Sequence, residues 1–220
     1  CDDDELVLLE KIKYYKTFEA GSQILWRGDE LAFVGSVVKG VASLSKTMKD
    51  ARTQVVGLLL PSDFIGRPGR SQIDFDVTAT TEVTLCCFAR KPFEELVEDT
   101  PHIAQRLMEL ALDELDAARD WMVLLGRKTA REKIATFVHM LVQRTRIPDA
   151  DGQIQALNMP MTRDQIADYL GLTLETVSRQ FNALKKDGIL AFSDRHNFAV
   201  LDVIGLQDAT GNDSDGGMIS

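Results

Sequence analysis

Long hydrophobic runs are missing from this sequence of 220 residues. No apolar stretch approaches the roughly 20 residues that a membrane-spanning helix needs, and no charged-then-apolar signal segment opens the chain. We therefore expect a cytoplasmic protein with no membrane partner. The chain has only 3 cysteines, an odd number, which favours free thiols in a reducing compartment over a disulfide framework.

Catalytic motifs are also missing. The sequence has no nucleophile elbow, phosphate-binding loop or catalytic carboxylate pair, so we predict that the protein is not an enzyme. Positive charge is in short supply, because 25 basic residues stand against 34 acidic ones for a net charge of −9. This balance argues against a general polyanion binder. It leaves room for sequence-specific DNA binding, since a small basic face can lie on an acidic protein.

What is present, 45% hydrophobic and 27% charged residues, is typical of one large or two small globular domains. Residue 1 is Cys rather than Met, so we expect the natural N-terminus to lie upstream. Residues 1–16 predict a short helix with an acidic first turn. From about 18 to 92, short runs rich in Val, Thr and aromatics alternate with Gly, Pro and Asp turns, which predicts a β-barrel or jelly roll with Trp26 in its core. The expected strands are 33–38, 41–44, 54–60, 77–80 and 83–88.

After Pro101 the pattern becomes helical and continues to about Leu125 without Gly or Pro. Two apolar stripes run along this stretch, whereas packing on a barrel needs one. The second stripe favours a contact with the same helix of a second copy; the alternative is one broad face inside a larger monomeric core. We assign the dimer contact to Ile103, Leu107, Leu110, Ala117, Asp120, Trp121 and Leu124.

Residues 162–188 predict a helix-turn-helix. Thr162 and Gln165 have the spacing of a capping box, and Gly171 is placed to end the first helix in the left-handed conformation. Thr173 can cap a second helix that ends by Gly188. Residues 189–192 and 198–201 alternate like the hairpin, or wing, of a winged helix. The alternative is a helical hairpin whose polar side chains merely face solvent.

The second helix carries a face suited to DNA. Glu175, Ser178 and Arg179 stand at i, i+3 and i+4, so they project together near the end of the helix that enters the major groove. Arginine can bridge guanine O6 and N7, and glutamate can accept from cytosine N4. Further DNA contacts are assigned to Thr173, Thr176, Lys185, Lys186 and Arg195, the last three as phosphate contacts.

In this order of parts, the chain resembles the Crp/Fnr superfamily of bacterial transcription regulators over nearly its whole length. Residues 169–179, Tyr-Leu-Gly-Leu-Thr-Leu-Glu-Thr-Val-Ser-Arg, resemble the recognition element of the FNR branch, in which Glu, Ser and Arg read a TTGAT half-site. Residues 55–66, 112–121 and 126–131 resemble, more narrowly, the FNR/FnrL-type oxygen-responsive regulators of alphaproteobacteria.

The resemblance implies an α+β fold. A cyclic-nucleotide-binding-like jelly roll would occupy residues 1–100, a long dimerisation helix 101–127, a winged helix-turn-helix 128–205 and a disordered acidic tail 206–220. It also implies a homodimeric transcription activator that binds palindromes such as TTGAT-N4-ATCAA in double-stranded DNA and contacts RNA polymerase. The alternatives are a family member gated by a small ligand or by none, and an enzyme's regulatory domain that does not bind DNA.

Sensors of this superfamily bind either a cyclic nucleotide or an iron–sulfur cluster. Where nucleotide-binding relatives carry Gly-Glu, Gly66 is followed here by Arg67. Asp74 and Asp76 stand in the phosphate-binding region, where their charges would repel a phosphate. We therefore expect no cyclic nucleotide.

FNR proteins hold a 4Fe–4S cluster with three N-terminal cysteines and one on a barrel strand. The resemblance places Cys86 at the strand position, and strand alternation turns Cys87 toward the interior. Cys1 is either a ligand or a neighbouring extra cysteine. With at most two cysteines placed to bind, this chain cannot complete a four-thiolate site, so we expect the cluster in the intact protein.

Overall fold

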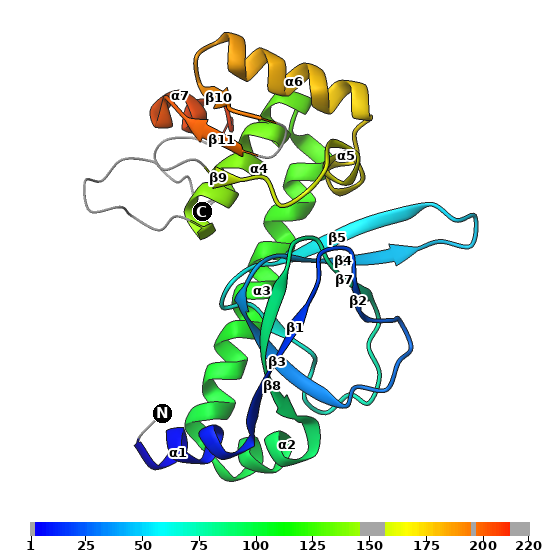
Figure 1. The fold of residues 1–220 in the computed structure, drawn as a ribbon, viewed down its shortest axis with the longest axis vertical. Coiled ribbons are helices and arrows are strands. Elements are labelled where there is room, and N and C mark those ends of the chain that lie inside the picture. The colour runs from blue at the N-terminus through cyan, green and yellow to red at the C-terminus, as the bar shows by residue number, and fades with distance from the viewer. Residues whose placement is uncertain (1–2, 146–156, 195–196, 212–220) are drawn as a thin grey trace. The chain divides into compact units, whose positions relative to one another are not determined.

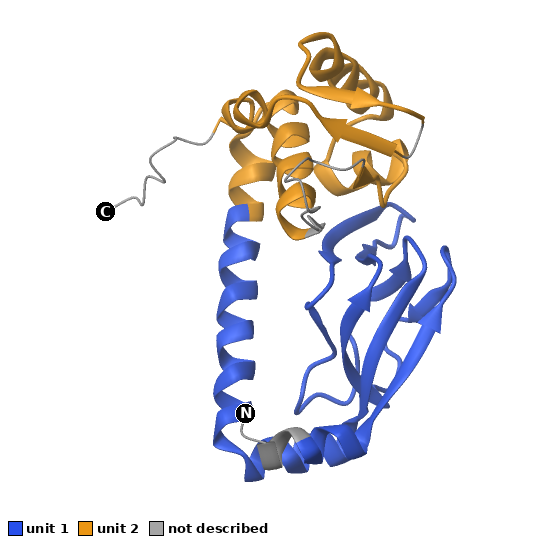
Figure 2. Ribbon diagram, turned by 60° about the vertical axis from the view of Figure 1, so that its left-hand side comes forward, with its two compact units in different colours: residues 1–120 blue, residues 121–220 orange. Residues whose placement is uncertain are grey.

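A computed structural model describes residues 3–145, 157–194 and 197–211 of the chain (Figure 1). It divides into two compact units, residues 1–120 and 121–220 (Figure 2). Within the described ranges, no helix combines the length and the apolar character that crossing a membrane requires.

The first unit begins with helix α1 (Asp3–Ile12) and continues in two four-stranded antiparallel sheets. One sheet has the order β1 (Lys13–Phe18), β8 (Val83–Ala89), β3 (Phe33–Lys39) and β6 (Phe64–Ile65). The other has the order β2 (Gln23–Leu25), β7 (Asp76–Ala79), β4 (Ala42–Thr47) and β5 (Thr53–Leu59). The sheets have a jelly-roll-like arrangement, which confirms the predicted fold class, although the described strands do not close into a barrel.

The core of the first unit comes from the inward positions of both sheets. Val34 and Leu85 from one sheet and Val77 and Ala79 from the other are completely buried, as period-two alternation along a strand requires. Helix α2 (Arg90–Asp99) follows β8 and closes this core with Phe93, whose ring lies 5.2 Å from that of Phe88 and 5.8 Å from that of Phe64.

The predicted N-terminal helix is present, but the extent expected for it and the burial expected for Trp26 are wrong. The N-terminal helix ends at Ile12, and Lys13–Phe18 form a strand because β1 pairs with β8 along its whole length, with a 3.1 Å hydrogen bond between the hydroxyls of Thr17 and Thr84. Trp26 is 61% exposed rather than in the core. It follows buried Leu25 and enters a turn, where its backbone N–H donates to the Asp29 carboxylate.

The second unit begins in helix α3 (Pro101–Arg127), whose last turns lead into α4 (Ala130–Thr145). The helix-turn-helix consists of α5 (Arg163–Leu170) and α6 (Leu174–Lys186). A three-stranded antiparallel sheet packs beside it in the order β10 (Leu190–Phe192), β11 (Asn197–Val200) and β9 (Leu157–Asn158). The predicted winged helix is therefore confirmed.

The predicted disordered tail is partly wrong, because Val203–Asp208 form a further helix, α7. The Asp202 side chain caps this helix by accepting from the Gly205 N–H at 2.8 Å, and Leu206 is 1% exposed. Lys128 also donates to the carbonyl of Thr210 at 3.0 Å. The cap and the buried leucine both stabilise this short helix. Residues 212–220 of the predicted tail lie outside the described residues.

Candidate nucleic-acid interface

The first helix of the helix-turn-helix is delimited by its own sequence. The Thr162 hydroxyl accepts from the Gln165 N–H at 3.2 Å, and the Gln165 side chain accepts from the Thr162 N–H at 2.9 Å, so the predicted capping box is present. Gly171 ends α5 with a φ of +61°, the left-handed conformation that glycine adopts without strain. These local signals fix where the turn begins.

The orientation of α6 follows from its apolar residues. Val177, Phe181 and Leu184 are buried and anchor one side of the helix in the second unit. Glu175 and Arg179 are exposed, and Ser178 is half-buried. We call Glu175, Ser178 and Arg179 the reading face, because all three lie away from the buried side of α6.

The charges at the two ends of α6 differ in sign. A hydrogen bond from its own backbone N–H, and then one from the Thr173 hydroxyl, lowers the pKa of the Glu175 carboxyl. Glu175 is therefore a carboxylate at neutral pH and can only accept hydrogen bonds. Lys185 and Lys186 are exposed in the last turn, where cations are favoured by the helix dipole. Arg195 lies outside the described residues.

Arg163 is a structural member of this region that the sequence analysis missed. Its guanidinium carbon lies 3.4 Å from the ring centroid of Phe181 on α6 and 5.0 Å from that of Phe192 on β10. Burial lowers the pKa of Arg163 to about 10, which still leaves it charged at neutral pH. This cation–π contact connects the first residue of α5 with the second helix and the wing. In the sequence, the single sign of this role is that Arg163 directly follows Thr162, the N-cap of α5.

Two basic residues of α4 bind the C-terminal ends of the two helices of the helix-turn-helix. Lys133, which is 8% exposed, donates to the carbonyl of Leu170 at 3.1 Å, next to the turn. Arg131 forms an ion pair of 2.6 Å with Asp187, the C-cap of α6. Both helices of the motif are thus fixed at their C-terminal ends by side chains from one supporting helix.

The predicted dimer residues fall into two groups. Ile103 and Leu124 are buried, Leu107 packs on the core of the first unit, and Trp121 stacks on Tyr169. Ile103 and Leu124 are therefore covered within the chain and Trp121 is covered in part, whereas the assignment of the seven residues to a contact with a second copy stays a prediction. Leu110 is half-buried, and Ala117 and Asp120 are exposed.

An exposed apolar stripe also runs along α3. Its large side chains are between 45% and 66% exposed, far more than an apolar core position allows. We call this set the α3 stripe: Met108, Leu112, Leu115, Met122 and Val123.

The cysteines of β8 point to opposite sides of the sheet, as strand alternation predicts. Cys87 is completely buried, and burial, reinforced by Cys86, raises its pKa to about 11. Cys86 is half-exposed opposite Tyr15 and Ser36, and burial also raises its pKa. Cys1 lies outside the described residues.

These residues do not fit a complete 4Fe–4S site. A cluster of this kind takes four thiolates, and the sequence holds 3 cysteines, of which Cys87 is directed into the core. Among the described residues, no group of three or more His, Cys, Asp or Glu side chains could hold a metal ion. Cys86 is the single described thiol that is available on the outer side of the sheet.

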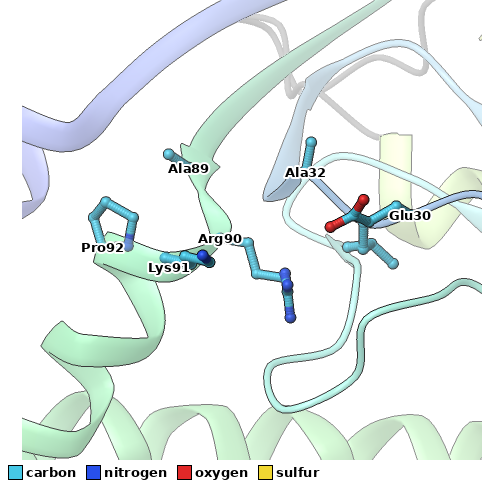
Figure 3. A pocket seen from close by; sticks show the side chains of 7 residues that line it. Glu30, Ala32, Ala89, Arg90, Lys91 and Pro92 are labelled. Atoms are coloured by element: carbon cyan, nitrogen blue, oxygen red, sulfur yellow. The ribbon is translucent and has the colours of Figure 1, made fainter.

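Asp74 and Asp76, the two carboxylates expected to repel a cyclic nucleotide, both interact with other groups of the chain. Asp74 accepts from Arg70, and Asp76 accepts from the Arg27 N–H at 2.9 Å. A separate pocket of about 280 Å³ lies where β8 meets α2 (Figure 3). Arg90 and Lys91 line it together with Glu30, so it presents both signs of charge.

Comparison with known proteins agrees with this architecture. The family model of the cyclic nucleotide-binding domain matches residues 15–100, and that of the Crp-like helix-turn-helix domain matches residues 132–209. The chain is 54% identical to the transcriptional activator protein FnrL of Cereibacter sphaeroides over 221 residues, which cover 99% of this chain and 89% of that protein. It is 40% identical to the nitrogen fixation regulation protein FixK of Bradyrhizobium diazoefficiens, over 86% of this chain and 79% of the relative.

Among solved structures, FixK2 from Bradyrhizobium japonicum is similar with a TM-score of 0.82 and 29% sequence identity, over 90% of this chain and 97% of that one. A Crp-family transcriptional regulator from Thermus thermophilus shares the fold, with a TM-score of 0.73 at 18% identity over 92% of this chain and 100% of that one. The sequence identity extends through the jelly roll, the long helix and the winged helix alike, and the chain belongs to the Crp/Fnr family of helix-turn-helix transcription regulators.

Proposed function

We propose that this protein is a homodimeric transcription activator that binds TTGAT-N4-ATCAA-like palindromes. The observation that carries the proposal is the reading face on α6, where a carboxylate and a guanidinium are exposed on a helix capped and anchored at both ends. A TTGAT half-site contains one G·C pair. Arg179 would contact its guanine and Glu175 its cytosine, and Lys185 and Lys186 would contact phosphates.

The two-fold symmetry of the palindrome requires two copies of the reading face. Half-sites about one helical turn apart are read by dimers whose recognition helices enter successive major grooves. The α3 stripe supports such a dimer, since a second copy would cover an apolar surface that is otherwise exposed. A bound activator dimer would then recruit RNA polymerase, the partner implied by the names of the relatives as activators.

A gel-shift titration tests the DNA-binding part. Duplexes that carry the palindrome should bind wild-type protein in competition with a large excess of unrelated DNA, and a duplex with both G·C pairs replaced by A·T should not. Equal affinity for both duplexes would contradict the proposed site. Failure to bind any DNA would favour the alternative, an enzyme's regulatory domain that does not bind DNA.

Oxygen control through a 4Fe–4S cluster is the finer part of the proposal. It is supported by the resemblance to oxygen-responsive regulators and by the outward position of Cys86, and it requires thiolates that this chain does not supply by itself. The second candidate is a family member that is gated by a small ligand or by none. Anaerobic reconstitution of the full-length protein separates the two: iron–sulfur absorbance that bleaches in air, and that Cys86→Ala removes, supports the first, and DNA binding indifferent to air supports the second.

A further inference from the structure

Two threonine hydroxyls lie between the charged side chains of the reading face. Thr173 Oγ1 accepts from the backbone N–H of Thr176 at 3.3 Å, and the hydroxyl of Thr173 donates to that of Thr176 at 3.1 Å. The Thr176 hydroxyl also accepts from Nη2 of Arg179 at 3.3 Å. The Thr176 hydroxyl thus links Thr173 and Arg179 in one short hydrogen-bonded chain.

We propose that Thr176 is a positioning residue that orients Arg179 for guanine and so sets base preference without touching a base. The inference rests on the proposed function, because it requires that Arg179 reads DNA. An arginine side chain has considerable rotamer entropy, part of which is lost when it is fixed against a base. A guanidinium already held at Nη2 has fewer conformations to lose on binding.

The geometry suits this role. Thr176 is half-buried in the first turn of α6, where the bond from its N–H to Thr173 holds its backbone and the bond from the Thr173 hydroxyl holds its own hydroxyl. Arg179 follows three residues later, on the same side of the helix. The bond to Thr176 uses one of the five guanidinium N–H donors, which leaves enough donors for the two guanine acceptors O6 and N7.

A direct phosphate contact is the competing role for Thr176, and it has a different signature. Phosphates are the same at every base pair, so losing such a contact lowers the affinity for all sequences alike. Losing an orientation of Arg179 instead lowers the affinity only where a guanine is present. The two roles can therefore be separated by measuring two duplexes with each variant.

The experiment compares Thr176→Val with Thr176→Ser in the full chain. Fluorescence anisotropy would measure the affinity for the palindrome and for a duplex in which the G·C pair of each half-site is A·T. Valine has the shape of threonine and a similar helix propensity, and the cap bond to the Thr176 N–H does not involve the replaced hydroxyl. We expect Thr176→Val to lower the preference for the G·C duplex roughly fivefold by freeing Arg179, with unchanged affinity for the A·T duplex. Thr176→Ser should retain the preference.

Each other outcome is informative. Equal weakening on both duplexes, or an unchanged preference in Thr176→Val, would overturn the positioning role. Arg179→Ala is measured in parallel. If Arg179→Ala abolishes the preference and Thr176→Val does not, this inference alone fails, whereas a preference that survives Arg179→Ala removes the proposed reading face itself. Thermal melts of both threonine variants, compared with wild type, show that any change occurs in folded protein.

Discussion

Trp121 and Tyr169 stack face to face, with ring centroids 4.0 Å apart and ring planes inclined by 24°. Trp121 belongs to the last turns of α3, and Tyr169 to the first helix of the helix-turn-helix. Phe137 of α4 meets this pair edge-on, with its ring at 67° to that of Tyr169. The end of the long helix is therefore part of the second unit and contacts the helix-turn-helix through α5.

The stack should contribute measurably to the stability of the second unit. We expect Trp121→Ala to lower the free energy of unfolding by roughly 2–4 kcal/mol, because it removes a half-buried aromatic ring and its contact with Tyr169. Trp121→Phe is the matched control and should lose less than half as much. Chemical denaturation followed by circular dichroism measures both, and equal losses for the two variants would argue against the stack.

The guanine contact is tested through Arg179→Ala. Specific binding should fall by about 1–3 kcal/mol per half-site relative to unrelated DNA, because the contact with O6 and N7 is lost. The salt-dependent background should remain, since Lys185 and Lys186 still meet phosphates. Binding isotherms at several salt concentrations measure both the specific affinity and the salt-dependent background. A uniform loss with intact base preferences would show that the reading face is assigned to the wrong residues.

Glu175 should determine the identity of one base pair. Glu175→Val removes the single acid of the reading face, so we expect relaxed or altered preference at one position of each half-site rather than weaker binding everywhere. Selection from a pool of half-site variants measures the preference at every position. Glu175→Gln is the matched control, because its amide can still accept but also donates, and it should shift the preference differently from valine.

Acidic residues beside the α3 stripe should weaken the proposed dimer. Asp113, Glu114, Asp116 and Asp120 are all exposed, and like charges brought together across a two-fold contact repel one another. We expect Asp120→Ala to strengthen self-association and Leu115→Asp to weaken it. Sedimentation velocity over a range of concentrations measures both, and an unchanged profile for both variants would exclude a dimer through this helix.

Cys87 should make stability depend on alkaline pH. Its pKa rises from the ordinary thiol value of about 9 to about 11 in the folded chain, so the folded state retains the proton longer than the unfolded state. The contribution of the protonated Cys87 thiol to the free energy of unfolding is fully present below about pH 9. It is lost as the pH rises through about 11. Urea melts of wild type and Cys87→Ala across this range isolate it from the tyrosines and lysines. Parallel pH profiles would contradict the prediction.

Features with local signals were predicted from the sequence, and features made by tertiary contacts were not. The capping box of Thr162 and the turn at Gly171 depend on neighbouring residues, so the helix-turn-helix could be located to the residue. The strand after Ile12 forms because β8 lies beside it, and no local pattern announces that pairing. Arg163 was missed for the same reason, since its aromatic partners are distant in sequence.

The α3 stripe shows a second limit. Periodicity identifies two apolar stripes on a helix but does not say which one the chain itself covers. Trp121 was assigned to the contact with a second copy, and Met122, its neighbour, was not, whereas the structure buries part of Trp121 and leaves Met122 66% exposed. A rotation of one residue around the helix axis changes which stripe faces inward.

The hydrogen bond from Lys128 to Thr210 joins residues 82 positions apart. Lys128 lies just after α3, and Thr210 lies just after α7, so one ammonium group holds the first and last parts of the winged helix together. A segment whose two ends meet can be attached, moved or replaced with little disturbance to its surroundings. The two ends of this segment therefore lie close together, as the termini of compact domains often do.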